Sequence, residues 1–291
     1  MSDAVKRLED YETRPRHLAT VVSSERLTAA SAPEEVRELV LEVDRPGFEY
    51  RVGQCIGVLA PGSPAFGHEH HFRLYSVADL PERGSSGRPR VTICVRRCHY
   101  LDEYSGERFP GIASNYLCDR APGDVVTVTG PYELPFDVPE ERDANLILIG
   151  SGTGIAPFRA LVKHIYRDVP DWQGRIWLFY GARSGLEMLY MNDERDDFAQ
   201  YYDRETFEAF RALSARPAWS DAPAWEQALE GRGAELWRLL GQAHTYVYVA
   251  GLEKMLGELD RVFVRLAGSP ERWERRKAEL AAGKRWVELV Y

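Results

Sequence analysis

A chain of 291 residues is long enough for two ordinary domains, each with its own hydrophobic core. Its composition, 44% hydrophobic and 28% charged, is typical of a soluble globular protein and argues against a disordered one. The formal net charge of -8 argues against nonspecific binding of nucleic acid, and no apolar run approaches the roughly 20 residues of a membrane-spanning helix.

The first residues, 1–16, are polar and mixed in charge and lack the apolar segment of a secretory signal. We expect a charged N-terminal arm there and a cytoplasmic protein. The cysteines are few and lack the spacing of metal or cluster ligands, which predicts reduced structural thiols and no metal site. They are Cys55, Cys94, Cys98 and Cys118.

The first half of the chain reads as antiparallel β structure. Short segments rich in β-branched residues are separated by Pro and Gly, and no helical periodicity intervenes, which favours a barrel or a sandwich. These segments cover residues 18–27, 36–44, 50–60, 90–97 and 124–131. A change of composition at residues 135–143, PFDVPEERD, indicates a domain boundary.

The second half alternates apolar strands with helical segments. The expected strands cover residues 145–149, 175–183, 245–252 and 286–291, and helical spacing covers residues 156–166, with a long helical and loop stretch after the second strand. Apolar strands that alternate with helices predict a doubly wound parallel sheet.

A glycine-rich turn follows the first of these strands, in NLILIGSGTGIAPFR. Gly150, Gly152 and Gly154 lie where a parallel strand turns into its helix, so backbone N–H groups there can approach a pyrophosphate. The usual dinucleotide fingerprint would place a third glycine where this chain has Pro157. Taken alone, the turn is also compatible with a purely structural role.

A second motif lies in the first half, in HHFRLYSVAD. Arg73 offers a cation for a phosphate, Tyr75 a flat apolar ring with a polar tip, and Ser76 a hydroxyl group. These are the groups that a flavin nucleotide requires.

Five motifs then occur in a recognisable order: RLYS at 73–76, GIASNYLCD at 111–119, GTGIAPFR at 152–159, YVAGLEKM at 248–255 and the terminal WVELVY. In these motifs the chain resembles the plant-type ferredoxin–NADP reductase family, from about residue 17 to residue 291. The resemblance implies an N-terminal arm over 1–16, an antiparallel β-barrel FAD-binding domain over 17–138 and an α/β NADP-binding domain over 139–291.

The resemblance also implies roles around FAD. Arg73 would bind the pyrophosphate, Tyr75 would pack on the flavin, and Ser76 would hydrogen-bond near flavin N5. Tyr100 would stack on the adenine, and the terminal Tyr291 would cover the flavin where the nicotinamide must enter, moving aside for hydride transfer. A second phosphate loop would consist of Ile112, Ala113 and Ser114. Ser76, Tyr75 and Tyr291 would thus lie at the reaction centre.

On the NADP side, the resemblance assigns the pyrophosphate loop to Gly152, Thr153 and Gly154, with further contacts from Arg183 and Tyr190. Ser214 matches a serine that meets the 2'-phosphate, but the family often has arginine next, where this chain has Ala215 followed by Arg216. A second basic residue and a tyrosine usually follow, at positions that here hold Pro223 and Trp225. We expect Arg216 to reach the phosphate and NADPH to be preferred over NADH.

Two departures concern the chemistry itself. The family commonly has cysteine where this chain has Ala250, and glutamate where it has Leu289, with Glu288 one place away. A shift of one residue in a strand turns a side chain to the opposite face. Either the C-terminal strand is shifted in register, or the usual side chains are replaced. Hydride transfer requires mainly the positioning of two rings, so we expect activity to survive.

The implied function is electron transfer between NADP(H) and a one-electron carrier protein, a separate acidic ferredoxin or flavodoxin. Arg96, with Arg97 and Arg88 or Arg90, would steer such a carrier to the enzyme. Two alternatives remain: a reductase component of an oxygenase or other dedicated system using NADH or NADPH, and a flavin-binding redox-sensing module without turnover.

Overall fold

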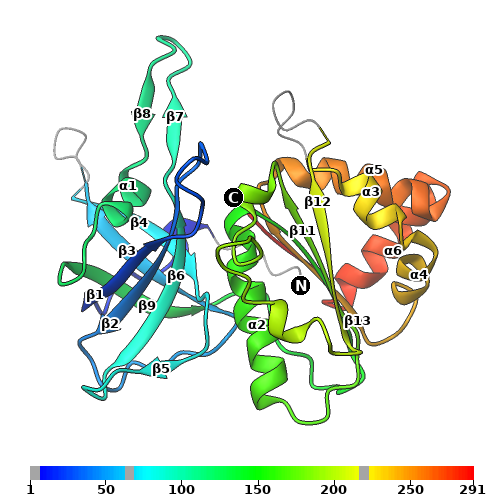
Figure 1. The fold of residues 1–291 in the computed structure, drawn as a ribbon, viewed down its shortest axis with the longest axis horizontal. Helices are drawn as coiled ribbons and strands as arrows, with labels where there is room; N and C mark the ends of the chain where they lie inside the picture. Colours follow the sequence, from blue (N-terminus) through cyan, green and yellow to red (C-terminus); the bar gives the residue numbers. More distant parts are fainter. Residues whose placement is uncertain (1–6, 63–68, 216–222) are drawn as a thin grey trace. The chain divides into compact units, whose positions relative to one another are not determined.

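The computed structural model describes residues 7–62, 69–215 and 223–291 (Figure 1). The chain divides into two compact units. Unit 1 comprises Met1–Leu27 and Pro33–Leu134, and unit 2 comprises Thr28–Ala32 and Pro135–Tyr291. Within the described ranges, none of the helices combines the length and the apolar character that crossing a membrane requires.

Over its described residues, unit 1 is built from β strands with one short helix. Its strands are β1 (His17–Arg26), β2 (Val36–Val43), β3 (Gln54–Pro61), β4 (His70–Ser76), β5 (Glu82–Arg83), β6 (Pro89–Arg96), β7 (His99–Leu101), β8 (Arg108–Pro110) and β9 (Val125–Glu133). The helical elements are the turn η1 (Leu8–Asp10) and the helix α1 (Ile112–Cys118).

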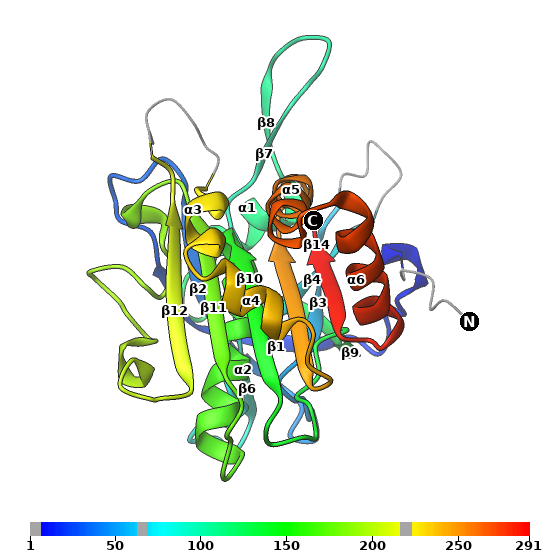
Figure 2. The same cartoon turned by 90° about the vertical axis from the view of Figure 1, so that its right-hand side faces the viewer.

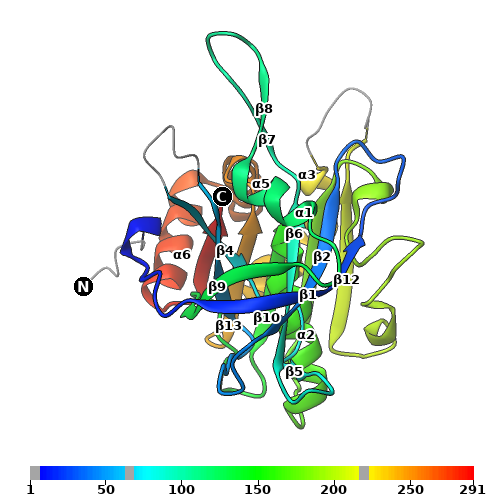
Figure 3. The ribbon, with the colours of Figure 1, turned by 90° about the vertical axis from the view of Figure 1, so that its left-hand side faces the viewer.

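Seven of these strands form an antiparallel sheet in the order β4-β3-β9-β1-β2-β6-β5. Alternate side chains of β1, β2, β6 and β9 point inward to one apolar core that includes Leu39, Leu41 and Ile93. The sheet curls toward a barrel, since an isolated antiparallel bridge joins Val77, directly after β4, to Ile93 of β6. Strands β7 and β8 form a separate hairpin that projects from the other strands of the unit (Figure 3).

Unit 2 contains a parallel sheet flanked by helices. Its strands are β10 (Asn145–Ser151), β11 (Ile176–Ala182), β12 (Phe207–Leu213), β13 (Thr245–Gly251) and β14 (Trp286–Val290). Its helices are α2 (Ile155–Asp168), α3 (Trp225–Glu230), α4 (Gly233–Leu239), α5 (Lys254–Ala267) and α6 (Pro270–Ala282). Its described residues also form the single turns η3 (Gly152–Gly154), η4 (Gly185–Glu187) and η5 (Ala199–Tyr201).

The strand order in this sheet is β12-β11-β10-β13-β14, and every neighbouring pair is parallel. Within this sheet the chain runs from the central strand β10 through β11 to the edge strand β12. It then crosses to the other side of β10, where it forms β13 and β14. At the carboxyl ends of β10 and β13 the winding direction reverses, which is where sheets of this type bind ligands.

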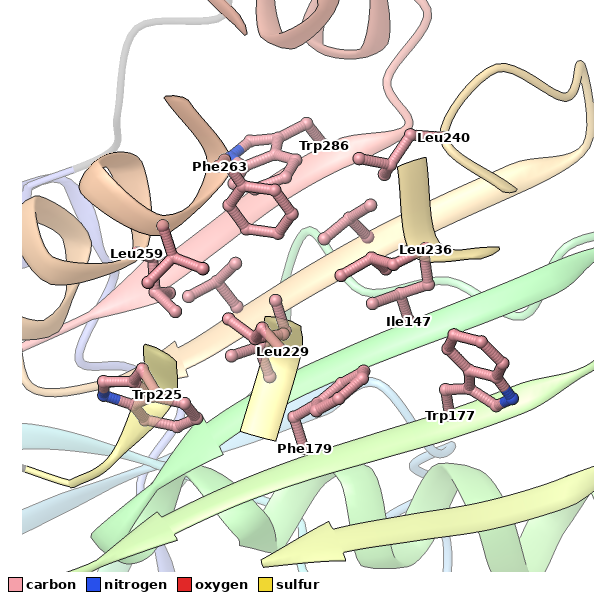
Figure 4. Packing of buried hydrophobic residues seen from close by; sticks show 14 of the residues in the cluster. Ile147, Trp177, Phe179, Trp225, Leu229, Leu236, Leu240, Leu259, Phe263 and Trp286 are labelled. Atoms are coloured by element: carbon pink, nitrogen blue, oxygen red, sulfur yellow. The ribbon is translucent and has the colours of Figure 1, made fainter. Parts of the chain in front are cut away.

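Helices cover both faces of the sheet (Figure 2). One face packs against α3, α4, α5 and α6 around a large apolar cluster, in which Trp177, Phe179 and Trp225 come from the β12 side and Phe263 and Trp286 from the β14 side (Figure 4). On the other face lies α2, with Phe158 and Leu161 buried. Because both faces are covered, all seven residues of β11 are buried, as expected for a central parallel strand.

The predicted architecture, an antiparallel β-barrel unit followed by a doubly wound parallel sheet, is confirmed by these two sheets. Strand β12 was missed, because its sequence FEAFRAL contains residues that also favour a helix. It lies at the edge of the sheet, where pairing with β11 overrides local preference. The predicted arm over residues 1–16 lies partly outside the described residues.

Candidate functional site

The glycine-rich turn lies at the carboxyl end of the central strand β10. Gly152 has φ of +53°, a left-handed conformation that favours glycine. A Cβ atom on Gly154 would lie 2.1 Å from the carbonyl oxygen of Ala250, at the end of β13. A larger residue would therefore push the turn away from the sheet, so the bare backbone is a steric requirement here.

This turn leads into α2, a helix of 14 residues. The helix start has no side-chain cap and no acidic residue in its first turn. Backbone N–H groups at such a helix end, together with the helix dipole, favour an anion. The turn Gly152–Gly154 and the start of α2 thus have the chemistry to hold a pyrophosphate.

Two tyrosine hydroxyl groups meet the turn. The buried Tyr180 of β11 donates to the carbonyl oxygen of Gly152 at 2.9 Å. The hydroxyl groups of Tyr291 and Thr153 are hydrogen-bonded to each other. Tyr291 is 55% exposed, whereas its N–H group donates to the carbonyl oxygen of Gly251 at 3.0 Å. The last residue of the chain is therefore anchored by its backbone beside the candidate pyrophosphate site.

The two departures from the family pattern face each other in the sheet. Ala250 pairs with Leu289, and the register between β13 and β14 runs without a shift from Val247–Trp286 to Gly251–Val290. Within this chain the pairing of β13 with β14 is therefore continuous, without a bulge.

Glu288 does not substitute for the missing carboxylate. Its Oε1 accepts a hydrogen bond from Trp286 Nε1 at 2.6 Å and forms an ion pair with Lys277 Nζ at 3.1 Å, on the side of β14 that α6 covers. Leu289 leaves the strand on the opposite face. The carboxyl edge of β13 and β14 therefore presents Ala250 and Leu289 where the family commonly has a thiol and a carboxylate.

The remaining nucleotide candidates lie along the β11–β12 edge. Ser214 follows β12, is 8% exposed, and donates its N–H group to the carbonyl oxygen of Ala182 at 3.3 Å. Arg183 directly follows β11, and its guanidinium group pairs with Glu187. Arg216 lies outside the described residues. Ser214 and Arg183 are therefore both at the carboxyl edge of the sheet, where an extended nucleotide would lie.

Tyr190 is placed differently. Its ring is fully buried, with the guanidinium group of Arg159 4.5 Å from the ring centre and that of Arg195 5.0 Å from it. Asp197 bridges the two cations, accepting from Arg159 Nε at 2.5 Å and Arg195 Nε at 2.9 Å. In this arrangement Tyr190 is a packing residue, and its contact with a nucleotide stays a prediction.

The flavin motif lies on β4, the edge strand next to β3. The guanidinium group of Arg73 is exposed and donates to the carbonyl oxygen of Phe72 at 2.7 Å. Among the described residues, no carboxylate forms an ion pair with it. Arg73 and Tyr75 leave the same face of the strand, and Ser76 ends it. Burial raises the pKa of Tyr75 well above its ordinary value, so the phenol stays protonated.

The second predicted phosphate loop is the start of α1, which packs against β3, β4 and β6. Ser114 Oγ accepts from the N–H group of Cys98 at 3.1 Å. Ala113 is buried, so only its backbone can reach a ligand, and Ile112 is 44% exposed. Asn115 also ties the start of α1 to the preceding segment, because its Nδ2 donates to the carbonyl oxygens of Cys98 and Gly111, both at 2.8 Å.

Arg97 adds to these contacts, and its part in steering a carrier stays a prediction. Its guanidinium group donates to Asn115 Oδ1 at 3.0 Å and pairs with Glu35 and Asp119, both at 2.8 Å. These contacts hold α1 on β6, so Arg97 acts within unit 1. Its neighbour Arg96 pairs with Glu34 at 3.6 Å. The other two arginines of the predicted docking patch also pair with carboxylates, Arg88 with Asp44 and Arg90 with Glu42.

The predicted adenine contact, Tyr100, lies on the β7–β8 hairpin. It pairs across the strands with Phe109, and the two rings are stacked with centres 5.5 Å apart and planes at 22°. Both residues are solvent-accessible, 57% for Tyr100 and 38% for Phe109. The hairpin therefore presents a flat aromatic surface of two rings.

The sequence interpretation missed three contributors: Tyr180, Asn115 and Phe109. Tyr180 lies in an apolar strand and looks like an ordinary core residue. Asn115 follows Ser114 within the recognised motif, which was a usable signal. Phe109 lies in the segment leading to α1, and only a predicted hairpin would have paired it with Tyr100.

Comparisons with known proteins agree with this geometry. The family model described as "Oxidoreductase NAD-binding domain" matches residues 148–260. The chain is 33% identical over 289 residues to the chloroplastic ferredoxin–NADP reductase leaf isozyme 1 of Oryza sativa subsp. japonica, covering 97% of this chain and 78% of the relative. It is 29% identical to the ferredoxin–NADP reductase of Spirulina sp, covering 97% of each chain.

Among solved structures, the ferredoxin–NADP reductase of Plasmodium falciparum has the same fold. Its TM-score is 0.71 at 19% identity, with 97% of this chain and 98% of that chain covered. The identity to the rice protein extends over nearly the full length of this chain. The chain belongs to the ferredoxin–NADP reductase family.

Proposed function

We propose that this protein is an FAD-dependent oxidoreductase that transfers electrons between NADP(H) and ferredoxin. The observation that carries the proposal is the bare turn Gly152–Gly154 at an uncapped helix start, in a chain that is 33% identical to a ferredoxin–NADP reductase. The division of labour, FAD on residues 17–138 and NADP on residues 139–291, is part of the proposal.

Residues of unit 1 have the chemistry to hold FAD. Arg73, a cation without a carboxylate partner among the described residues, would bind the pyrophosphate together with the backbone and hydroxyl groups of residues 112–114. Tyr75 would lie against the flavin and Tyr100 against the adenine. Ser76, at the end of β4, would hydrogen-bond at flavin N5.

Residues of unit 2 have the chemistry to hold NADP(H). The turn Gly152–Gly154 would bind the pyrophosphate, and Arg183 and Ser214 line the same edge of the sheet. A reductase from Plasmodium falciparum has been solved with 2'P-AMP, the portion of NADP that carries the distinguishing phosphate. We assign recognition of this phosphate to Ser214 and Arg216 and, on that basis, a preference for NADPH.

Bound FAD would supply the exchange between hydride transfer and single-electron transfer. The contribution of the chain is to bind, orient and exclude water. Tyr75 and Tyr291 would each present a ring to the flavin, and Tyr291 would move aside to admit the nicotinamide. The apolar pair Ala250 and Leu289 supplies no proton donor, so rate enhancement at this edge rests on ring positioning.

The choice of carrier is supported by the relatives, which are named ferredoxin–NADP reductases. We propose ferredoxin as the partner, with flavodoxin as a second substrate of the same docking surface. Arg96 is the patch residue that we assign to docking, since Arg97 is committed to α1. Among the described residues the cysteines form no disulfide bond, which supports the cytoplasm as the compartment of this reaction.

The test is steady-state electron transfer with the purified full-length chain. The protein should show the visible absorption of a bound flavin, released as FAD on denaturation. With NADPH and catalytic amounts of ferredoxin it should reduce cytochrome c, and the rate should depend on the ferredoxin concentration. A flavin-free protein would overturn the cofactor assignment, and a flavoprotein with no ferredoxin-dependent rate would point to a dedicated reductase component or a redox-sensing module.

A further inference from the structure

The hydrogen bond between Tyr291 and Thr153 joins two residues to which the proposed function gives different roles. Thr153 is the central residue of the turn proposed to hold the NADP pyrophosphate. Tyr291 is the ring proposed to block the flavin until the nicotinamide arrives. Their hydroxyl groups are in direct contact.

Both groups are presented from firmly held backbone. The N–H group of Tyr291 donates to Gly251 at 3.0 Å, and its carbonyl oxygen accepts from Glu253 at 3.3 Å. On the other side, Tyr180 holds the carbonyl oxygen of Gly152 at 2.9 Å. Because the backbone is fixed at both residues, the hydroxyl contact helps to hold the half-exposed ring of Tyr291 in its present position.

We propose that Thr153 is a positioning residue that couples pyrophosphate binding to the release of Tyr291. This inference rests on the proposed function, in which the turn binds NADP(H) and Tyr291 moves. Either hydroxyl group can be the donor in the present contact, and the proposal takes Thr153 as the donor. A threonine hydroxyl group has a single proton to donate. An anionic phosphate oxygen is a stronger acceptor than a phenol oxygen. When a pyrophosphate enters the turn, the Thr153 hydroxyl group turns to it and the contact with Tyr291 is lost.

The consequence is a division between the two halves of the nucleotide. The adenosine half with its 2'-phosphate binds along the β11–β12 edge and does not require Tyr291 to move. The nicotinamide half requires the ring to leave, and the contact with Thr153 opposes that movement. Removing the contact from the tyrosine side should therefore strengthen binding of NADP+ and leave binding of 2'P-AMP unchanged.

The experiment is a double-mutant cycle on the FAD-loaded protein, with binding measured by calorimetry. The variants are Tyr291→Phe, which keeps the ring, and Thr153→Val, which keeps the volume, alone and combined. The ligands are NADP+ and 2'P-AMP. Thr153→Ser, which keeps the hydroxyl group, is combined with Tyr291→Phe as the conservative control.

With the native Thr153, and equally in the Thr153→Ser background, Tyr291→Phe should strengthen binding of NADP+ roughly two- to tenfold, the effect of one neutral hydrogen bond. In the Thr153→Val background the same change should have a smaller effect, because the Thr153 hydroxyl group is already absent. Binding of 2'P-AMP should not respond to Tyr291→Phe in any background. A purely structural role for Thr153 would not produce this dependence on the background.

An equal effect of Tyr291→Phe in the wild-type and Thr153→Val backgrounds overturns the coupling, as does the lack of any effect in the wild type. If Thr153→Val fails to fold, as judged by circular dichroism, Thr153→Ala completes the same cycle. Failure of the proposed function has a different signature, because the wild-type protein would then not bind NADP+ at all.

Discussion

At the scale of single residues, the clearest contrast is between two arginines that both lie in recognised motifs. Arg73 projects to solvent with no ion-pair partner among the described residues, whereas Arg159 is 3% exposed and bound to Asp197. A cation without an ion-pair partner is available to a ligand, whereas a buried, paired cation destabilises the fold when its partner is removed. The exposure of the guanidinium group and its pairing with a carboxylate together distinguish an arginine available to a ligand from an arginine of the core.

Arg73→Ala should weaken FAD binding roughly tenfold to a hundredfold, because charged hydrogen bonds to phosphate are lost. The dissociation constant can be measured from the recovery of flavin fluorescence on dilution. Arg83→Ala is the matched control, since Arg83 is also exposed and its guanidinium group donates to the carbonyl oxygens of Pro46 and Gly87. Equal loss of affinity in both variants would show that Arg73 has no specific role.

Asp197→Ala should lower the free energy of unfolding by about 3 kcal/mol at pH 7, because it leaves the buried Arg159 without its carboxylate. Denaturant unfolding measures the change. Asp168→Ala is the control, since Asp168 pairs with Arg167 and His164 at a more exposed position, and it should cost about 1 kcal/mol or less.

The same carboxylate should give a pH dependence. Burial acts to raise the pKa of Asp197, but hydrogen bonds and charges from Arg195 and Arg159 outweigh burial, so its pKa in the folded protein lies below the ordinary value. Its contribution to stability is therefore complete above about pH 4 and is lost as the pH falls through the folded-state pKa. The difference between Asp197→Ala and the wild type should shrink on acidification. A difference that stays constant down to about pH 2 would contradict the assignment.

At the scale of elements, the sequence predicted those with a strong local pattern. The apolar runs of β10, β11 and β13 were found, because buried parallel strands are almost continuously hydrophobic. Strand β12 and the β7–β8 hairpin were not found. In both, pairing with another strand decides the structure, and in the hairpin the residues His99–Leu101 and Arg108–Pro110 are all exposed.

The candidate site was predictable to a similar degree. The glycine-rich motif places Gly152–Gly154 correctly where a strand turns into its helix, because glycine conformations leave a local signature. The role of Arg73, on a strand that was not predicted, stays a prediction. The hydroxyl contact between Thr153 and Tyr291 spans most of unit 2 in sequence. Only the return of β14 beside β13 brings the two residues together, and no local pattern encodes that.

The hairpin carries a prediction of its own. Phe109→Ala should weaken FAD binding several-fold, because Tyr100 loses the ring stacked behind it, with a loss of about 0.5–1.5 kcal/mol expected for an aromatic pair. FMN lacks the adenine, so its binding should not change. Leu101→Ala, at another exposed position of the hairpin, is the control. An equal effect of Phe109→Ala on FMN would mean that the hairpin does not contact the adenine.

At the scale of the whole molecule, the negative net charge disfavours association with the proposed acidic partner. The chain carries a formal charge of -8, and an acidic ferredoxin would be repelled by the protein as a whole. Docking therefore has to use a local surface, and Arg96 remains partly exposed there while paired with Glu34. Added salt screens both interactions: it slows association where it weakens the local attraction and speeds association where it weakens the overall repulsion.

Arg96→Glu should lower the ferredoxin-dependent rate, and the loss should be larger at low than at high salt, because screening removes the introduced repulsion. Cytochrome c reduction at two ionic strengths measures it. Arg238→Glu changes the same charge at an exposed position of unit 2 and serves as the control. An equal loss with a small artificial acceptor would show that Arg96 does not act through docking.

The most direct test of the account is anaerobic rapid mixing of the purified flavoprotein with NADPH and, in parallel, with NADH, following the visible absorption of the flavin. We predict fast bleaching by NADPH and much slower bleaching by NADH, because the site at the carboxyl edge of β10–β12 is assigned to a nucleotide that carries a 2'-phosphate. Equal bleaching by both nucleotides would contradict the assignment of Ser214 and Arg216. No bleaching by either would contradict the proposed oxidoreductase function.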